Sequence, residues 1–339
     1  MIKYLVSGLL AGVFAFSGLA SAKDVHELRL AHYLPPMHNM AANVLPGWAD
    51  RLDKASNGRL KVTIYPAGQL LGVSEIFDGV RGGVADLGWS MPGATPGRFP
   101  VMSLMEAPFI FTRAENASRV LMEAYEKGYM NKEFQGVKVL YLHTHHAGIL
   151  NTKTEIKDLA GLKGKRIRFP SPPVRSLLTA LGADPVGVPA PQAYESLERG
   201  VLDGVAFPYD AMQGLRLGEQ VKYHIDFPMY VLTFYLVMNQ QKFDSLPPDL
   251  QKIIMDHAGM EEAVAVGRSW DESEDNSKAF VQKQGNHIVT LSEAEQKLWR
   301  EKAQPVIQAG IAEVDKAGLP GREIYDMAVK RAAELQAKQ

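Results

Sequence analysis

The chain alternates short apolar runs with amphipathic stretches, and this alternation constrains its fold more than any other feature of the sequence. Residues 28–32, 59–65 and 84–90 are short and rich in apolar or β-branched residues, which is typical of strands. Between them, residues 41–52 and 75–80 carry apolar side chains at helical spacing. This order predicts an α/β domain built on a largely parallel sheet.

The same rhythm returns in the middle of the chain and predicts a second α/β lobe. The expected strands and helices there are 165–169, 174–181, 191–200 and 201–207. Ordinary domain sizes also predict two domains for 339 residues. From Pro248 a helical pattern continues to about residue 284, and a helix of that length, roughly 54 Å, exceeds the width of one small domain. We therefore expect two lobes that are hinged around a cleft and bridged by one long helix.

Residues 1–22 have the three parts of a secretory signal peptide. Lys3 supplies the positive charge, an apolar run follows, and residues 20–22 (Ala-Ser-Ala) form a cleavage site before Lys23. The alternative is an uncleaved membrane anchor, which the short apolar run disfavours because a membrane span needs about 20 apolar residues. We therefore expect the protein to be exported.

Composition excludes several classes of function. The chain has no cysteine, which excludes a disulfide scaffold, a Cys-ligated metal site and a cysteine nucleophile. A net charge of −1 argues against a nucleic-acid partner, because nucleic-acid-binding proteins usually carry a strong basic excess. The sequence contains no G-x-S-x-G elbow, phosphate-binding loop or dinucleotide fingerprint. We therefore expect a protein that is not an enzyme and holds no cofactor.

Three clustered histidines leave open a different class of function, that of a metal-dependent enzyme. On a strand, His143 and His145 would point to one face and His146 to the other, so two of them could share a metal ion. No third ligand or H-E-x-x-H motif accompanies them. We interpret the cluster as ligand contacts or structural groups and expect no metal, and the alternative is an exported metal-dependent hydrolase that uses it.

The strand expected at residues 165–169 carries the strongest candidate for ligand binding. Alternation places Ile167 and Phe169 on one face, with Arg166 and Arg168 on the other. An arginine at the carboxyl end of such a strand points towards the crevice in which α/β folds bind ligands. Its planar guanidinium suits a carboxylate bidentately. Spacing alone also permits an exposed arginine on an edge strand.

With these stretches in place, the sequence resembles a known family. Loose matches run in order along nearly the whole chain after residue 22: LRLAH at 28–32, NGRL at 57–60, YPAGQL at 65–70, GVAD at 83–86, FP at 99–100, APF at 107–109, DLAGLKGKRIR at 158–168, LERGVLDG at 197–204, Asn239, and Leu246-Pro247. Together they resemble the periplasmic solute-binding protein of a tripartite ATP-independent periplasmic (TRAP) transporter, of the DctP type.

The resemblance implies a type II-like periplasmic binding protein whose two α/β lobes close over a carboxylate. We expect lobe I to comprise residues 23–146 and 239–280, and lobe II residues 147–238 and 281–339, with the C-terminal helices in lobe II. The implied partners are a small organic acid and the small and large membrane subunits of the permease.

The resemblance also carries over individual pocket positions. The carboxylate-binding arginine of the family falls on Arg168. With sialic-acid-binding members as the guide, the other positions fall on Tyr33, Trp89, Ser90, Met91, Ser171 and Phe207. A second arginine of those members has no counterpart here, where His145 and His146 stand instead, and we add Phe234 as a further aromatic wall. Trp89 and Phe207 are alternatively core residues at strand ends.

One arginine among aromatic groups predicts a ligand with one carboxylate and an apolar remainder, because a sugar acid would leave too few hydrogen bonds satisfied. We predict an organic monocarboxylate, with aromatic, 2-oxo or 2-hydroxy acids favoured. Arg168 would clamp the carboxylate, and His145 or His146 would donate to an oxygen next to it. The alternative ligand is a C4-dicarboxylate, which needs a second cation such as Arg175 or a protonated histidine.

Overall fold

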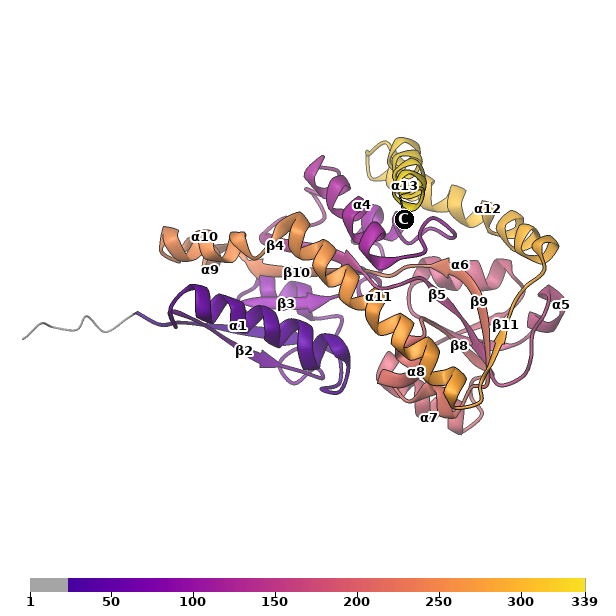
Figure 1. Ribbon diagram of the computed structural model, residues 1–339. Coiled ribbons are helices and arrows are strands. Elements are labelled where there is room, and N and C mark those ends of the chain that lie inside the picture. Colours follow the sequence, from indigo (N-terminus) through magenta and orange to yellow (C-terminus); the bar gives the residue numbers. More distant parts are fainter. Residues whose placement is uncertain (1–23, 339) are drawn as a thin grey trace, which may run out of the picture.

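The computed structural model describes residues 24–338, which form two α/β lobes joined side by side (Figure 1). The fold class and the two-lobe arrangement predicted from the sequence are confirmed. The signal peptide expected at residues 1–22 lies outside the described residues. No helix among residues 24–338 is both long and apolar enough to cross a membrane.

The first sheet forms the core of lobe I. Its strands lie in the order β2–β1–β3–β10–β4. Their bounds are β1 His26–His32, β2 Leu60–Tyr65, β3 Leu87–Ser90, β4 Val137–Thr144 and β10 Thr233–Asn239. β1 pairs in parallel with β2 and β3, whereas β10 runs antiparallel to β3 and β4. The carboxyl ends of β1 and β3 therefore lie at the same edge as the start of β10.

The second sheet forms the core of lobe II, with the strand order β11–β9–β5–β8–β6–β7. Its strands are β5 Gly148–Thr152, β6 Arg166–Phe169, β7 Asp184–Gly187, β8 Gly204–Phe207, β9 Tyr223–Tyr230 and β11 His287–Val289. β6 pairs in parallel with β7 and β8. Because β6 lies between two strands, Arg168 is not on an edge strand.

Helices surround both sheets. Their bounds are α1 Leu45–Ala55, α2 Ile76–Arg81, α3 Pro100–Leu104, α4 Ala114–Glu126, α5 Leu159–Leu162, α6 Pro172–Ala180, α7 Ala193–Glu198, α8 Asp210–Gly214, α9 Gln240–Asp244, α10 Pro248–Asp256, α11 Gly259–Lys283, α12 Glu293–Lys316 and α13 Gly321–Gln336. Four short turns of other helix types are η1 Met40–Val44, η2 Pro92–Ala94, η3 Ala190–Gln192 and η4 Leu217–Glu219 among the described residues. In α1, Trp48 and Leu52 are fully buried one turn apart, which is the amphipathic pattern read from the sequence.

The long helix expected from Pro248 to about residue 284 is in fact two helices, α10 and α11. Ala258 is extended, with φ −138° and ψ −175°, and Gly259 has φ +77°, a conformation that glycine adopts at little steric cost. The expected length was therefore wrong. α11 still bridges the lobes, because it contacts α4 and β4 on one side and α8 on the other (Figure 1).

The expected boundary at residues 238/239 is also wrong for one strand. It places β10, and with it Phe234, in lobe II, whereas β10 pairs with β3 and β4 of the first sheet. The chain returns to lobe I at residues 231–232 because these backbone hydrogen bonds are made in the first sheet. The C-terminal helices likewise extend beyond lobe II, since α12 contacts both α3 and α6, and α13 contacts α4.

Candidate functional site

A small cavity of about 40 Å³ lies between the lobes, where strand ends from both sheets meet α11. Lobe I contributes Tyr33, Trp89, Met91 and Phe234 to its wall, and lobe II contributes Arg168 and Phe207. His145, at the crossing between β4 and β5, and Trp270, on α11, also line it. The cavity therefore has walls from both lobes and from the segments that join them.

One wall of the cavity is a column of stacked aromatic rings. The Tyr33 and Trp89 ring centroids are 5.5 Å apart, and those of Trp89 and Phe234 are 4.9 Å apart with planes 10° from parallel. Trp270 continues the column, 5.9 Å and 12° from Phe234. Tyr33 and Trp89 follow or end parallel strands and Phe234 begins the antiparallel one, so the sheet topology brings the three rings together. The column gives the cavity a rigid apolar wall suited to an aromatic ring.

His143 supports this wall from behind. Trp89 Nε1 donates a hydrogen bond to His143 Nε2 at 2.8 Å, and both side chains are fully buried. Burial lowers the pKa of His143 to about 3, so the ring is neutral and Nε2 is available as an acceptor. His143 therefore fixes the orientation of Trp89, and it is Trp89 that reaches the cavity.

Arg168 brings a buried positive charge to the opposite side. It is 2% exposed, and its Nε donates to the Val188 carbonyl oxygen at 3.0 Å. The guanidinium carbon lies 4.1 Å from the centroid of the Phe207 ring, a cation–π contact. Burial lowers the pKa of Arg168 to about 10, although Tyr230 and Tyr33 partly offset this effect. Arg166, two residues earlier, is half-exposed and ion-paired with Asp203.

No carboxylate among residues 24–338 forms an ion pair with Arg168, whose hydrogen bonds go to backbone carbonyls. A buried guanidinium without a counterion is costly, so it favours an anionic partner that enters the cavity. The possibility of an exposed arginine is excluded.

Seven of the predicted site residues line the cavity: Tyr33, Trp89, Met91, His145, Arg168, Phe207 and Phe234. The structure places the other three elsewhere. Ser90 donates to the carbonyl oxygen of Val73 at 3.2 Å, and Ser171 donates to the buried Glu106 carboxylate at 2.6 Å. Each hydroxyl is bound to an acceptor of the protein itself. Ser90 and Ser171 were expected to be pocket residues, but neither is among the residues that line the cavity.

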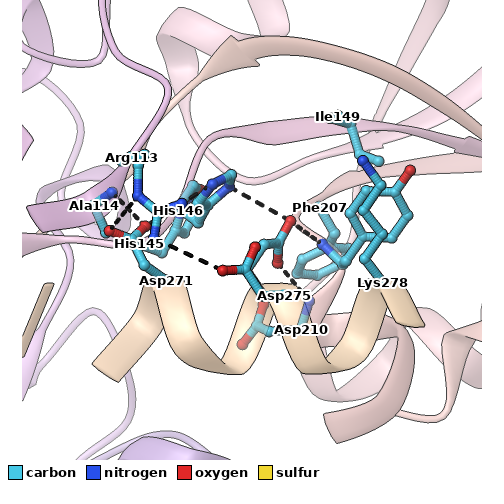
Figure 2. Close-up of polar contacts among 12 residues, drawn as sticks. Arg113, Ala114, His145, His146, Ile149, Phe207, Asp210, Asp271, Asp275 and Lys278 are labelled. Atoms are coloured by element: carbon cyan, nitrogen blue, oxygen red, sulfur yellow. Dashed lines mark hydrogen bonds and ion pairs between the residues drawn. The ribbon is translucent and has the colours of Figure 1, made fainter. Parts of the chain in front are cut away.

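His146 also lies outside the cavity, beside α11. Its ring nitrogens are 3.6 Å from a Glu274 oxygen and 3.9 Å from an Asp271 oxygen. Figure 2 shows His146 close to Asp271 and Arg113 at the junction of the lobes. Burial lowers its pKa, which the Asp271 carboxylate partly offsets. The expectation that His146 contacts the ligand is therefore replaced by a contact with the bridging helix.

Trp270, His38 and Asp210 line the cavity but were not predicted from the sequence. His38 Nδ1 accepts from the Met40 backbone N–H at 3.3 Å, so its Nε2 carries the hydrogen and faces an Asp210 oxygen at 3.4 Å. Trp270 falls on the apolar face of a helical pattern, which reads as core. Asp210 comes just after the end of an expected strand, and this position was the one signal in the sequence that could have identified any of the three as a site residue.

The histidine cluster is not arranged as a metal site. His143 Nε2 is occupied by Trp89, and His145 Nδ1 by the His146 carbonyl oxygen. Among residues 24–338, no group of three or more His, Asp or Glu side chains is placed to hold a metal ion.

The chain matches one protein-family model and is similar to several proteins of known structure. The model of the family "bacterial extracellular solute-binding protein, family 7" matches residues 30–313. The chain is similar to a TRAP solute-binding protein of Rhodoferax ferrireducens solved with copurified benzoate, with 32% identity, 91% of this chain and 98% of that chain covered, and a TM-score of 0.86.

Two further solved structures extend the comparison. A TRAP solute-binding protein from a marine metagenome, specific for aromatic acid ligands and solved with 3-hydroxybenzoate, is 31% identical, covering 91% of this chain and 98% of that chain at a TM-score of 0.87. A protein of Bordetella bronchiseptica solved with (R)- and (S)-mandelate is 27% identical, covering 91% and 99% at a TM-score of 0.86.

Proposed function

The chain belongs to the bacterial extracellular solute-binding proteins of family 7, a family of TRAP solute-binding proteins that are not enzymes, and from this premise we propose that it captures an aromatic monocarboxylate. Its lobes would close over the ligand and deliver it to the small and large membrane subunits of the transporter. Export through the signal peptide expected at residues 1–22 would place it in the periplasm, where relatives act. An exported hydrolase is not proposed.

The observation that carries this proposal is the buried, unpaired guanidinium of Arg168. A ligand carboxylate would supply the missing negative charge and accept bidentate hydrogen bonds that a lysine could not match. Such charge-assisted bonds are strongest in surroundings of low dielectric constant, as around the buried side chain of Arg168.

The aromatic column supports a ring as the remainder of the ligand. Tyr33, Trp89, Phe234 and Trp270 form an apolar wall of stacked rings, and Phe207 lies against the arginine. Similar proteins were solved with benzoate, 3-hydroxybenzoate and mandelate, which each join one carboxylate to one aromatic ring. Aliphatic 2-oxo and 2-hydroxy acids would use less of this apolar surface.

The charges around the cavity argue against a C4-dicarboxylate. Arg175 is exposed and lies near Phe169, away from the cavity lining. Burial lowers the pKa of His145 to about 4, which leaves this ring neutral. A second carboxylate would instead meet the buried carboxylate of Asp210. Two negative charges buried close together repel each other strongly, which disfavours a dicarboxylate ligand.

Calorimetric titration of a panel of carboxylates tests the proposal. We expect benzoate-type acids to bind and succinate to fail to compete with them. Arg168→Ala should weaken the best ligand by at least 30-fold, equivalent to about 2 kcal/mol or more. Arg166→Ala is the matched control, because Arg166 lies on the same strand but pairs with Asp203. No binding across the panel, or a loss within threefold for Arg168→Ala, would overturn the proposal.

A further inference from the structure

His145 lines the cavity and carries a buried hydrogen-bond acceptor that has no partner among the described residues. Its Nδ1 lies 2.5 Å from the backbone carbonyl oxygen of His146. A carbonyl oxygen only accepts, so Nδ1 carries the hydrogen and Nε2 of the neutral ring carries a lone pair. That Nε2 atom is buried and has no hydrogen-bond partner among the described residues. The expectation that His145 donates to the ligand is therefore reversed.

Trp270 presents a donor beside it. The indole Nε1–H is buried and also lacks a partner within residues 24–338. The His145 and Trp270 ring centroids are 5.9 Å apart, and each residue is only 4% exposed. The stack of Trp270 on Phe234 fixes the indole, and the Nδ1 hydrogen bond fixes the imidazole. Both rings line the cavity that contains Arg168.

An unpaired acceptor and an unpaired donor on two neighbouring rings match a hydroxyl group, which can donate one hydrogen bond and accept another. A carboxylate or keto oxygen would satisfy Trp270 alone and leave His145 Nε2 unpaired, and a bare ring would leave both unpaired. Each buried polar group that stays unpaired weakens binding, because it has lost its hydrogen bonds to water. The pair therefore distinguishes a hydroxyl from these other groups.

We propose that His145 and Trp270 form a hydroxyl-recognition site, so that the preferred ligand is a hydroxylated aromatic monocarboxylate. This inference rests on the proposed function, because Arg168 must hold the carboxylate while the hydroxyl reaches the pair. His145 donates nothing to the ligand in this arrangement. Trp270 and His145 act as specificity-determining residues, and Arg168 supplies the main anchor.

Two pairs of ligands that differ by one hydroxyl test this inference: 3-hydroxybenzoate with benzoate, and mandelate with phenylacetate. By calorimetry, the protein should bind the hydroxylated member of at least one pair about tenfold more tightly, as expected for satisfying two buried groups. Trp270→Phe keeps the stack on Phe234 but removes the donor, and it should reduce the preference to within about threefold. His145→Asn keeps a polar group near the Nδ1 position but removes Nε2, and it should do the same.

Trp299→Phe is the matched control, because this indole donates to Glu295 on its own helix, away from the cavity. It should keep the hydroxyl preference, and thermal unfolding should show that all three variants fold. If the acids bind with no preference in either pair, or if Trp270→Phe keeps the preference, the hydroxyl site is wrong while the proposed function stands. If none of the four acids binds, both fail.

Discussion

Asp271 and Glu274 lie one turn apart on α11 and hold backbone groups of different lobes. Asp271 accepts hydrogen bonds from the backbone N–H groups of Ala114 and Glu115 at 2.7 and 3.1 Å, at the start of α4 in lobe I. Glu274 accepts from those of Tyr209 and Asp210, both at 2.7 Å, at the start of α8 in lobe II. The bridging helix is thus fastened to both lobes through otherwise unpaired helix N-termini.

Removing either carboxylate should therefore destabilise the protein. Asp271→Ala and Glu274→Ala each leave buried N–H groups unpaired, and we expect each to lower the free energy of unfolding by about 1–3 kcal/mol in urea denaturation. The adjacent Glu272 is exposed, so Glu272→Ala should change it by no more than about 0.5 kcal/mol. Equal effects of the three substitutions would contradict this role of α11.

Glu106 should make stability depend on pH. Burial raises its pKa to about 7, an effect that hydrogen bonds from Ser171 and Thr233 partly offset. The folded protein therefore favours protonated Glu106, and this contribution is complete below the ordinary pKa of 4.5 and is lost as the pH rises through about 7.

Urea denaturation from pH 5 to 8 provides the measurement. Relative to Glu106→Gln, the free energy of unfolding of the wild type should fall by an amount on the order of 2–3 kcal/mol over this range. Taking the difference between the two proteins cancels the titration of the buried histidines. Parallel pH profiles would show that Glu106 does not titrate in this way.

Gly267 should be intolerant of alanine although it lies within a helix. A Cβ added there would come within 2.7 Å of the Ala114 carbonyl oxygen and 2.8 Å of Ser118 Oγ on α4. Gly267→Ala should therefore push α11 away from α4 and lower the free energy of unfolding by about 1–3 kcal/mol.

Gly47→Ala in α1 is the comparison, because the nearest atom to its added Cβ is 3.9 Å away. This change should raise the free energy of unfolding by up to about 1 kcal/mol through helix propensity alone. Stabilisation by both substitutions would mean that the two helices are less closely packed at Gly267 than described.

Asp210 should contribute to discrimination between monocarboxylates and dicarboxylates. Its carboxylate is buried and lines the cavity, where it would repel a second negative charge. Asp210→Asn keeps the shape and an oxygen that can accept from His38 Nε2, but removes the charge. We expect the ratio of the affinity for an aromatic monocarboxylate to that for succinate to fall on the order of tenfold in calorimetric competition. An unchanged ratio would show that Asp210 does not set this preference.

The periodicity of the sequence predicted much of the fold, because the spacing of apolar residues encodes which face of each element is buried. It missed the break at Gly259, because a single glycine does not interrupt the helical spacing of the apolar residues on either side of it. The expected lobe boundary placed β10 in the wrong lobe, because strand partners far apart in the chain leave no local signal.

For the site, the sequence by itself determined that Arg168 lies near the carboxyl end of a strand, and that aromatic residues lie near strand ends in both lobes. Only the tertiary structure decided which of these side chains meet. Trp89 reaches the cavity while Ser171 turns to Glu106, and Trp270 joins from a helix more than 100 residues away from Arg168 in the chain. The reason is physical: local patterns report burial, but burial in a core and burial against a ligand look alike until the two lobes are brought together.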